Sequence, residues 1–310
     1  MLPYQDDFLL SLKAHQYSLE TIYNYEQDLI VFGLFLKNDA RISFDEISKR
    51  TIDLYKAFLV SQDRKTPTLK RQTKQLSAGS INRMLSTLRR YLGYLSDMDY
   101  QIPLSPDAIK LVRMPKPHPR VAELDALIQL IESPIKFEKI KDVALRNRAI
   151  LEVLFATGMR ISELVSLNRD QIDKSGRIFV RGKGKKERFV YLTARAKEHI
   201  KNYLDVRDDQ NSALFIPYRG RNIGTSKARI STNYVQMKMK QYRTRLGINV
   251  PTSPHSLRHG FATYLAEQGA NPAAIQILLG HESLHTTTRY VHASDTYAEK
   301  THHQFHPLKK

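Results

Sequence analysis

The chain has 310 residues, of which 41% are hydrophobic, enough for two globular domains with cores of their own. It carries 49 Lys and Arg against 31 Asp and Glu, which gives a formal net charge of +18. Such an excess favours a protein that binds a polyanion, most simply nucleic acid; the alternative is a basic soluble protein with no such partner. The absence of cysteine excludes disulfides, thiolate metal sites and thiol nucleophiles. The N-terminus lacks the features of a signal peptide, and no apolar run approaches the ~18 residues that span a bilayer, so we expect a cytoplasmic protein without a membrane partner.

Residues 1–102 predict a helical first domain. Apolar residues recur at three- and four-residue spacing from Ser18 to about residue 38, again over 52–59, and again from about Ser80 to residue 95. The third helix has an apolar side and a basic side. A solvated face is the alternative reading of that basic side, whose candidates for DNA contact are Arg83, Arg89 and Arg90.

Residues 64–74 separate the second and third helices and are polar and aperiodic, with five basic residues. This pattern predicts a loop. A basic loop beside a basic helix face suggests a phosphate-contacting surface, with Lys70 and Arg71 as candidates. A flexible solvated loop is the alternative.

Proline is concentrated after the first domain, with five of the chain's 13 prolines in residues 101–120. Proline removes backbone donors and disfavours helix at the residue before it. We therefore predict an extended basic linker over residues 103–122 and a second domain over residues 123–310. Such a linker would let two domains form a clamp around a duplex.

The second domain is predicted to be mainly α with a small β-sheet. A helix over Ala144–Ala156 should end at Gly158, with a short helix over 161–167 after Arg160. Two β-prone runs, 177–180 and 188–192, flank a turn and predict a hairpin. The turn carries three lysines: Lys183, Lys185 and Lys186.

Two helices near the C-terminus have clear start and stop signals. The first should begin at Ser253-Pro254 and end at Gly269, and the second should begin at Asn271-Pro272 and end at Gly280. His255 and Arg258 are three residues apart in the first turn of the former helix, so they share a face.

The stretch that follows Gly280 contains His281-Glu282-x-x-His285, which matches the zinc-protease motif H-E-x-x-H. That motif requires both histidines on one continuous helix. Here a helix-stopping glycine precedes it and a threonine run follows it. We therefore expect no metal site and no other cofactor, and we expect the histidine-rich tail to chelate adventitious metal rather than to use a metal. The stretch is either an ordinary helix end or the carrier of a nucleophile, Tyr290.

A set of six residues describes one chemistry when taken together. A tyrosine hydroxyl can attack a phosphodiester and retain its bond energy in a phosphotyrosine. Two arginines suit the extra charge of the transition state, a lysine can protonate the leaving 5′ oxygen, and histidines can bind the phosphate or accept the tyrosine proton. Each member has an ordinary structural explanation when taken alone. The six are Arg160, Lys183, His255, Arg258, His281 and Tyr290.

Four separate motifs give the chain a resemblance to the tyrosine recombinase family. They are Ala156-Thr-Gly-Met-Arg-Ile-Ser-Glu-Leu164, Gly182-Lys-Gly-Lys-Lys-Glu-Arg188, Pro254-His-Ser-Leu-Arg-His259 and the stretch from Leu279 through Tyr290 to His292. The resemblance covers nearly all of residues 123–310 and, more loosely, the first domain, which is similar to the family's SAM-like core-binding domain.

The resemblance implies a role for each residue of the set. Tyr290 is then the nucleophile, Arg160 and Arg258 bind the scissile phosphate, and Lys183 is the general acid. His255 and His281 complete the phosphate pocket and assist proton transfer, while Glu163 supports Arg160.

Within the family the chain looks most like the Xer recombinases, in its lack of an arm-binding domain and in its ending, His303-Gln304-x-x-His306-Pro307. That implies inverted-repeat half-sites, a homo- or hetero-tetramer on two duplexes, and a possible DNA translocase as activator. It also implies that the C-terminal tail of each protomer docks into a neighbour. It also implies a role in chromosome or plasmid dimer resolution. The long loop at residues 64–74 leaves open an integrase or transposase of a mobile element or phage. The remaining alternatives are a type IB topoisomerase-like enzyme and a catalytically idle DNA-binding regulator.

Overall fold

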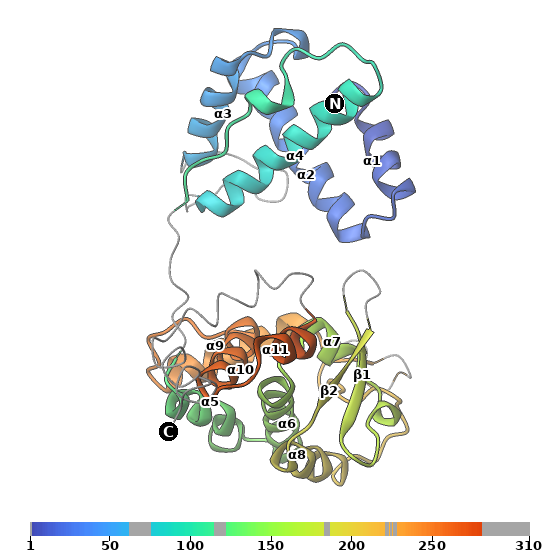
Figure 1. Cartoon of the computed structure of the whole chain (residues 1–310), viewed down its shortest axis with the longest axis vertical. Coiled ribbons are helices and arrows are strands. Elements are labelled where there is room, and N and C mark those ends of the chain that lie inside the picture. The colour runs from blue at the N-terminus through green and yellow to red at the C-terminus, as the bar shows by residue number, and fades with distance from the viewer. Residues whose placement is uncertain are drawn as a thin grey trace, which may run out of the picture. The chain divides into compact units, whose positions relative to one another are not determined.

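The computed structural model describes residues 2–61, 76–114, 122–182, 187–220, 223, 225 and 228–280. The chain divides into two compact units, Met1–Pro117 and His118–Lys310, each of which is described by itself (Figure 1). None of the described helices is both long and apolar enough to cross a membrane.

The first unit is a group of helices packed around α4, as its apolar periodicity predicts. Three serines cap α2, α3 and α4, each accepting a hydrogen bond from the backbone N–H three residues further on: Ser18, Ser48 and Ser77. Leu85, Leu92 and Leu95 of α4 are fully buried in the core of this unit. Its helices are α1 (Gln5–Ala14), α2 (Leu19–Phe35), α3 (Lys49–Val60) and α4 (Ala78–Asp97), with shorter turns at Leu36–Ala40, Phe44–Glu46 and Pro106–Ala108.

The first unit extends beyond the predicted boundary at residue 102, so the linker prediction was wrong in its first half. Ile109 is fully buried in the core of the first unit. The side chain of Asn82 donates to the Val112 carbonyl at 2.8 Å and accepts from the Val112 N–H at 2.7 Å. Apolar residues between the prolines therefore anchor this segment to α4. Residues 115–121 lie outside the described residues.

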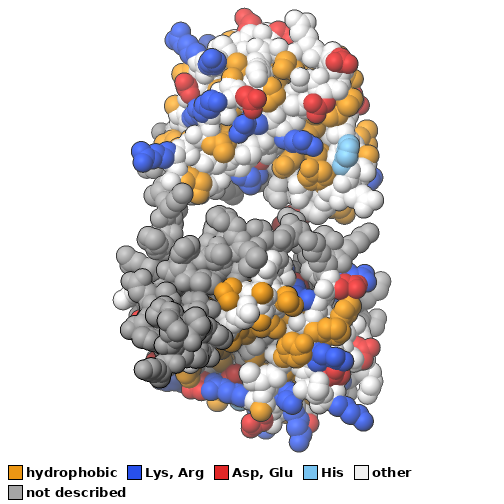
Figure 2. Space-filling model, viewed as in Figure 1, with side chains coloured by type: hydrophobic (Ala, Val, Ile, Leu, Met, Phe, Trp, Pro, Cys, Tyr) orange, Lys and Arg blue, Asp and Glu red, His pale blue; other side chains and the backbone are white. Residues whose placement is uncertain are grey.

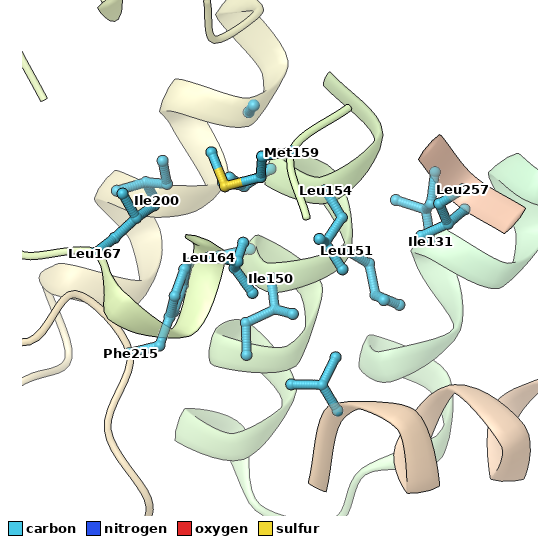
Figure 3. Close-up of a cluster of buried hydrophobic side chains, with 14 of the residues drawn as sticks. Ile131, Ile150, Leu151, Leu154, Met159, Leu164, Leu167, Ile200, Phe215 and Leu257 are labelled. Atoms are coloured by element: carbon cyan, nitrogen blue, oxygen red, sulfur yellow. The ribbon is translucent and has the colours of Figure 1, made fainter. Parts of the chain in front are cut away.

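The second unit is built around α6, which packs against α5, α8 and α10 (Figure 1). Figure 3 shows side chains of α6 meeting those of α5, α7, α8 and α10 in one core, with Leu151, Leu154 and Leu164 each at most 2% exposed. The helices are α5 (Leu124–Phe137), α6 (Lys141–Thr157), α7 (Ile161–Ser166), α8 (Ala194–Leu204), α9 (Thr232–Arg245), α10 (Pro254–Glu267) and α11 (Pro272–Leu279), with a short turn at Arg169–Gln171.

The predicted hairpin is present as strands β1 (Arg177–Arg181) and β2 (Glu187–Tyr191), which pair antiparallel with Phe179 opposite Phe189. Alternate residues of each strand are buried, as expected for a sheet with one face on the core. The inward positions of β2 are Arg188 and Val190, so one of them carries a charge. The chain is therefore mainly helical with a two-stranded sheet, as predicted.

A buried carboxylate in the first unit has an electrostatic cost that depends on pH. Asp28 of α2 has a side chain 3% exposed and accepts hydrogen bonds from Arg83 Nη1 at 2.5 Å and Thr87 Oγ1 at 2.9 Å. Burial raises the pKa of Asp28 above 3.8, although Arg83 and Thr87 act in the opposite direction.

We expect Asp28→Asn to become more stable relative to the wild type as the pH rises from about 4 to about 7. When folding raises the pKa of an acid, the free energy of unfolding of the protein decreases as the pH rises toward that pKa. Asparagine does not titrate, so the variant does not show this decrease. Urea unfolding followed by circular dichroism measures this, since the chain has no tryptophan. Asp53→Asn, with a side chain 75% exposed, is the control. A stability difference that stays constant over this range would contradict the expectation.

Candidate active site

Arg160 lies where α6 ends and α7 begins, and local geometry holds it there. Gly158 ends α6 in the left-handed conformation (φ 60°), and a Cβ at this position would lie 2.4 Å from Phe261 Cδ1. Arg160 then caps α7, where its backbone N–H donates to Glu163 Oε2 at 2.8 Å and its Nη1 donates to Glu163 Oε1 at 3.0 Å. The predicted support of Arg160 by Glu163 is thus a pair of hydrogen bonds.

His255 and Arg258 lie in the first turn of α10, which Ser253 caps. Arg258 is 4% exposed, and its Nη1 donates to the Gly158 carbonyl at 2.8 Å. His255 lies one turn earlier on the same helix and is exposed at the surface. The helix that the sequence predicts for these two residues is present, with His255 exposed and Arg258 buried.

Arg160 and Arg258 are distant in sequence but meet at the C-terminal end of α11. Arg258 Nη2 donates to the Leu279 carbonyl at 2.5 Å, and Arg160 Nη2 lies 3.5 Å from the Gly280 carbonyl. Gly280 ends α11 in the left-handed conformation (φ 64°). The structure therefore places both predicted phosphate-binding arginines next to the residue that precedes His281.

A pocket of about 640 Å³ lies beside these residues, between the starts of α7 and α10 and one side of α9. Arg160, His255, Lys240 and Arg243 line it, and none of its lining residues in the described part of the chain is acidic. The start of α10 adds the positive end of a helix dipole. Cations and a helix start without a facing carboxylate favour an anion such as a phosphate.

The electrostatics of the site agree with this. Burial alone would raise the pKa of Glu163, but hydrogen bonds from Arg188 and Arg160 outweigh it and hold the pKa below 4.5, so the carboxylate is charged. His255 lies at the surface, but neighbouring groups still displace part of its hydration. This partial loss of hydration and the positive charges of Arg258 and Arg160 lower the pKa of His255 from 6.5. A neutral His255 is able to accept a proton at neutral pH.

Several predicted site residues lie outside the described residues: Lys70, Arg71, Lys183, Lys185, Lys186, His281 and Tyr290. The residues that precede two of them are described. A Cβ at Gly182 would lie 3.4 Å from Arg160 Nη1, and one at Gly280 would lie 3.0 Å from Arg188 Cδ. The hairpin turn and the C-terminal segment thus both start beside the arginine cluster.

Two of the three arginines predicted to contact DNA from α4 have partners within the protein. Arg83 is bound to Asp28, and Arg89 Nη2 lies 3.3 Å from Asp107 Oδ1, while Arg90 is exposed. Figure 2 shows Lys and Arg side chains scattered among Asp and Glu over the face of this unit in view. DNA contact by these three arginines stays a prediction.

Sequence reasoning did not select Arg188, Lys240 or Arg243 as site residues. Arg188 carried a usable signal, because it occupies an inward position in the alternating pattern of β2. A charge at such a position needs a buried partner. The sequence of α9 offered no such signal for Lys240 and Arg243, because nothing in its spacing indicates which of its cations line the pocket.

A second pocket, of about 680 Å³, lies between the α5–α6 turn and the other side of α9. Its buried cation, Arg146, donates to Asn147 and to the Ile216 carbonyl. Its carboxylate, Glu138, accepts from Tyr242 at 2.5 Å and from Lys238 at 2.8 Å. The central charges of this pocket are thus satisfied within the protein, and we do not assign the chemistry to it.

In the part of the chain that the structure describes, no group of three or more His, Asp or Glu is arranged to hold a metal ion. The H-E-x-x-H stretch, residues 281–285, lies outside that part. Its relation to α11 is nevertheless defined, because α11 ends at Leu279 and Gly280 leaves the helical conformation. The described helix α11 therefore ends before the first of these histidines.

Comparison with known families finds two matches. Residues 120–296 match the phage integrase family, and residues 6–98 match the phage integrase N-terminal SAM-like domain. The tyrosine recombinase XerD of Staphylococcus haemolyticus (strain JCSC1435) is 32% identical over 297 residues, covering 94% of this chain and 93% of the relative. The tyrosine recombinase XerC of Thermodesulfovibrio yellowstonii is 36% identical over 248 residues, covering 76% of this chain and 79% of the relative.

Solved structures give the same fold. The crystal structure of XerA recombinase has 26% identity and a TM-score of 0.51, covering 98% of both chains. XerH bound to its difH substrate has 22% identity and a TM-score of 0.69, covering 93% of this chain and 81% of that one. The Tn1549 transposon integrase with a circular intermediate DNA has 19% identity and a TM-score of 0.71, covering 98% of this chain and 99% of that one. At these two lower identities the likeness concerns the fold alone.

We expect the imidazole of His255 to titrate below pH 6.5 in the free protein and to move toward that value in Arg160→Gln, which removes one of the charges that lower it. The histidine Cε1–H signals in NMR report the titration, and His255→Gln identifies the signal. Arg195→Gln removes an arginine of α8 with a side chain 45% exposed and is the control. A midpoint at or above 6.5, or one that Arg160→Gln leaves in place, would contradict this account of the site.

Proposed function

The chain belongs to the phage integrase family of tyrosine recombinases, enzymes that cleave and rejoin DNA through a phosphotyrosine intermediate, and we propose that Tyr290 is its nucleophile at a specific DNA site. The observation that carries the proposal is the meeting of Arg160 and Arg258 at the end of α11. Arg160 lines a pocket whose described lining is free of acids, and the chain continues from the end of α11 to Tyr290.

In the cleavage step, the hydroxyl oxygen of Tyr290 attacks the scissile phosphorus. A bond forms between that oxygen and phosphorus, and the bond from phosphorus to the 5′ oxygen breaks. The 3′ end of the DNA stays attached to the protein as a phosphotyrosine, and the other end leaves as a 5′ hydroxyl. Because one phosphodiester replaces another, attack by a 5′ hydroxyl on the phosphotyrosine rejoins the DNA without an external energy source.

Arg160 and Arg258 stabilise the transition state of this step. Their guanidinium groups are planar and permanently charged, which suits paired hydrogen bonds to the non-bridging oxygens. Burial of Arg258 at 4% exposure fixes its direction before the DNA arrives. A preorganised charge of this kind is worth more in a site that excludes water than in bulk solvent.

Two proton transfers complete the step. We assign the proton donated to the leaving 5′ oxygen to Lys183, which follows Gly182 and hence starts beside Arg160. The tyrosine proton goes to His255 or His281. The lowered pKa of His255 favours the neutral form that can accept it.

The biological role that we propose is that of a Xer-type recombinase. Relatives named XerC and XerD match it over nearly their whole length, which supports resolution of chromosome or plasmid dimers in the cytoplasm, as part of chromosome partition. The finer proposals are a DNA site made of inverted-repeat half-sites, a tetramer of recombinases on two duplexes, and activation by a DNA translocase.

The alternatives predict different behaviour. A mobile-element integrase or transposase would recombine ends that differ in sequence, and the basic loop at residues 64–74 is the feature that favours it. A type IB topoisomerase-like enzyme would relax supercoiled plasmid that lacks the recombination site. An idle regulator would bind the site and form no covalent adduct.

We expect a nicked suicide duplex carrying the site to give an adduct that resists SDS, in the presence of EDTA. The site is first recovered by binding selection from random duplexes. The nick lets the 5′ fragment diffuse away, so the phosphotyrosine accumulates. Tyr290→Phe lacks the nucleophile and should give none, while Tyr191→Phe, which alters an exposed tyrosine of β2, should behave as the wild type. An adduct that persists in Tyr290→Phe would refute the assignment of the nucleophile. Cleavage that EDTA abolishes would indicate that the reaction requires a metal ion.

We expect Lys183→Ala to slow cleavage of the ordinary duplex by about 10²–10⁴-fold, the usual contribution of a general acid. A duplex with sulfur at the 5′-bridging position should restore most of that loss, because a thiolate leaves without being protonated. Single-turnover rates on the two substrates measure this, with Lys201→Ala on α8 as control. If sulfur substitution leaves the Lys183→Ala defect unchanged, the general acid is another residue.

A further inference from the structure

We infer that Arg188 is a positioning residue for strand cleavage: it fixes Arg160 and the end of α11 relative to each other through Glu163. The inference rests on the function proposed above. Arg188 lies on β2, is 8% exposed and points into the second unit rather than to solvent. Burying a guanidinium is costly unless it is paired and hydrogen-bonded, so its partners define what it does.

The first partner is Glu163, which Arg188 shares with Arg160. Arg188 takes both carboxylate oxygens, with Nη1 to Oε1 at 2.9 Å and Nη2 to Oε2 at 2.8 Å. The Arg160 side chain then makes a single bond to the carboxylate, from Nη1 to Oε1 at 3.0 Å. Because a guanidinium has five donors, Arg160 keeps N–H groups for a phosphate.

This sharing sets the charge that faces the substrate. Two guanidinium groups and one carboxylate leave a net positive charge at the cluster, and the Arg160 side chain is its more exposed member, at 31% against 6% for Arg188. Without Arg188, Arg160 would be the remaining partner of the carboxylate, through its backbone N–H and Nη1, and the carboxylate could turn to bind the Arg160 guanidinium through both oxygens. That arrangement would satisfy Arg160 within the protein and weaken its hold on a phosphate.

The second partner is the C-terminal end of α11. Arg188 Nε donates to the Leu278 carbonyl at 2.8 Å, while Arg258 and Arg160 reach the next two carbonyls, those of Leu279 and Gly280. Three arginines thus hold three consecutive carbonyls at the negative end of a helix. Two of these arginines are also our phosphate ligands, so Arg188 is the one that can hold α11 in place when the DNA is bound.

Two glycines show how closely the neighbouring segments approach this cluster. A Cβ at Gly182 would lie 3.3 Å from Glu163 Oε1 and 3.5 Å from Arg188 Nη1. A Cβ at Gly280 would lie 3.0 Å from Arg188 Cδ. These glycines directly precede Lys183 and His281. Arg188 therefore lies where the Lys183 turn, Arg160 and the Tyr290 segment all start.

The test compares Arg188→Lys and Glu163→Gln with the wild type in single-turnover cleavage of the suicide duplex, at protein concentrations that saturate binding. Lysine keeps the charge but cannot bind both carboxylate oxygens or Leu278 in the same way. We expect a fall of about 10–100-fold in the cleavage rate of bound DNA, the usual cost of misplacing a reacting group by a fraction of an ångström to an ångström. The dissociation constant for the duplex should change by less than ~3-fold.

The double variant separates positioning from a general structural defect. If Arg188 acts through Glu163, the double variant should cleave no more slowly than the slower single variant, because both changes remove the same link. Arg181→Lys is the matched control, since Arg181 forms an exposed ion pair with Glu187 on the same hairpin, and we expect its rate to stay within ~2-fold of the wild type. Losses that multiply in the double variant would overturn the inference.

A second variant covers the case in which Arg188→Lys does not fold. Gly182→Ala keeps every charge and crowds Glu163 and Arg160, so we expect a several-fold slower cleavage of bound DNA. Gly93→Ala, where an added Cβ meets nothing within 4 Å, is its control and should cleave as the wild type does. Wild-type rates in both Gly182→Ala and any folded Arg188→Lys protein would overturn the inference.

Failure of the inference and failure of the proposed function give different results. If the wild type forms a Tyr290-dependent adduct and Arg188→Lys cleaves at the wild-type rate, Arg188 has no positioning role while the function stands. If the wild type forms no such adduct, the proposed function and this inference are both overturned.

Discussion

The last turn of α11 is the constraint on which the site depends. A helix end leaves its final carbonyl groups without partners inside the helix, and their partial negative charge attracts cations. Here Arg188, Arg258 and Arg160 supply the donors, each from a different segment of the chain. One short helix end therefore draws together a strand, a helix start and a helix junction that the sequence keeps far apart. The segment that carries Tyr290 begins where these three meet.

The core of the second unit holds the segments that carry these arginines in fixed positions. The helix α6 packs against α5, α8 and α10 (Figure 3), and its left-handed end at Gly158 directs the chain toward Arg160. The carbonyl of the same glycine accepts a hydrogen bond from Arg258. Close packing transmits position, because a dense interior has few alternative arrangements. The arginines are thus directed by buried leucines that have no chemistry of their own.

Much of this could be predicted from the sequence where the signal is local. Caps such as Ser18 and Ser253, the stops at Gly158 and Gly280, and the hairpin strands all follow from short-range rules, and the structure confirms them. The sequence did not identify the helices α1, α5, α8 and α9 separately. The segment around Ile109, which packs in the core of the first unit, was predicted to be linker. What the sequence could not show is non-local: the sharing of Glu163 by two arginines and the side of α9 that lines the pocket depend on tertiary contacts.

The backbone at Gly280 also bears on how the H-E-x-x-H match is weighed. A zinc site of that pattern needs two histidines one turn apart on a continuous helix, because only then do both rings point at the same ion. At φ 64° Gly280 has left the right-handed helix, so α11 cannot be that helix. The same φ gives the Gly280 carbonyl its position near Arg160 Nη2, at 3.5 Å. The conformation of Gly280 therefore means that α11 does not provide the helix of a metal site. It also places the Gly280 carbonyl at the turn on which both arginines that would hold a phosphate converge, which favours a phosphate site.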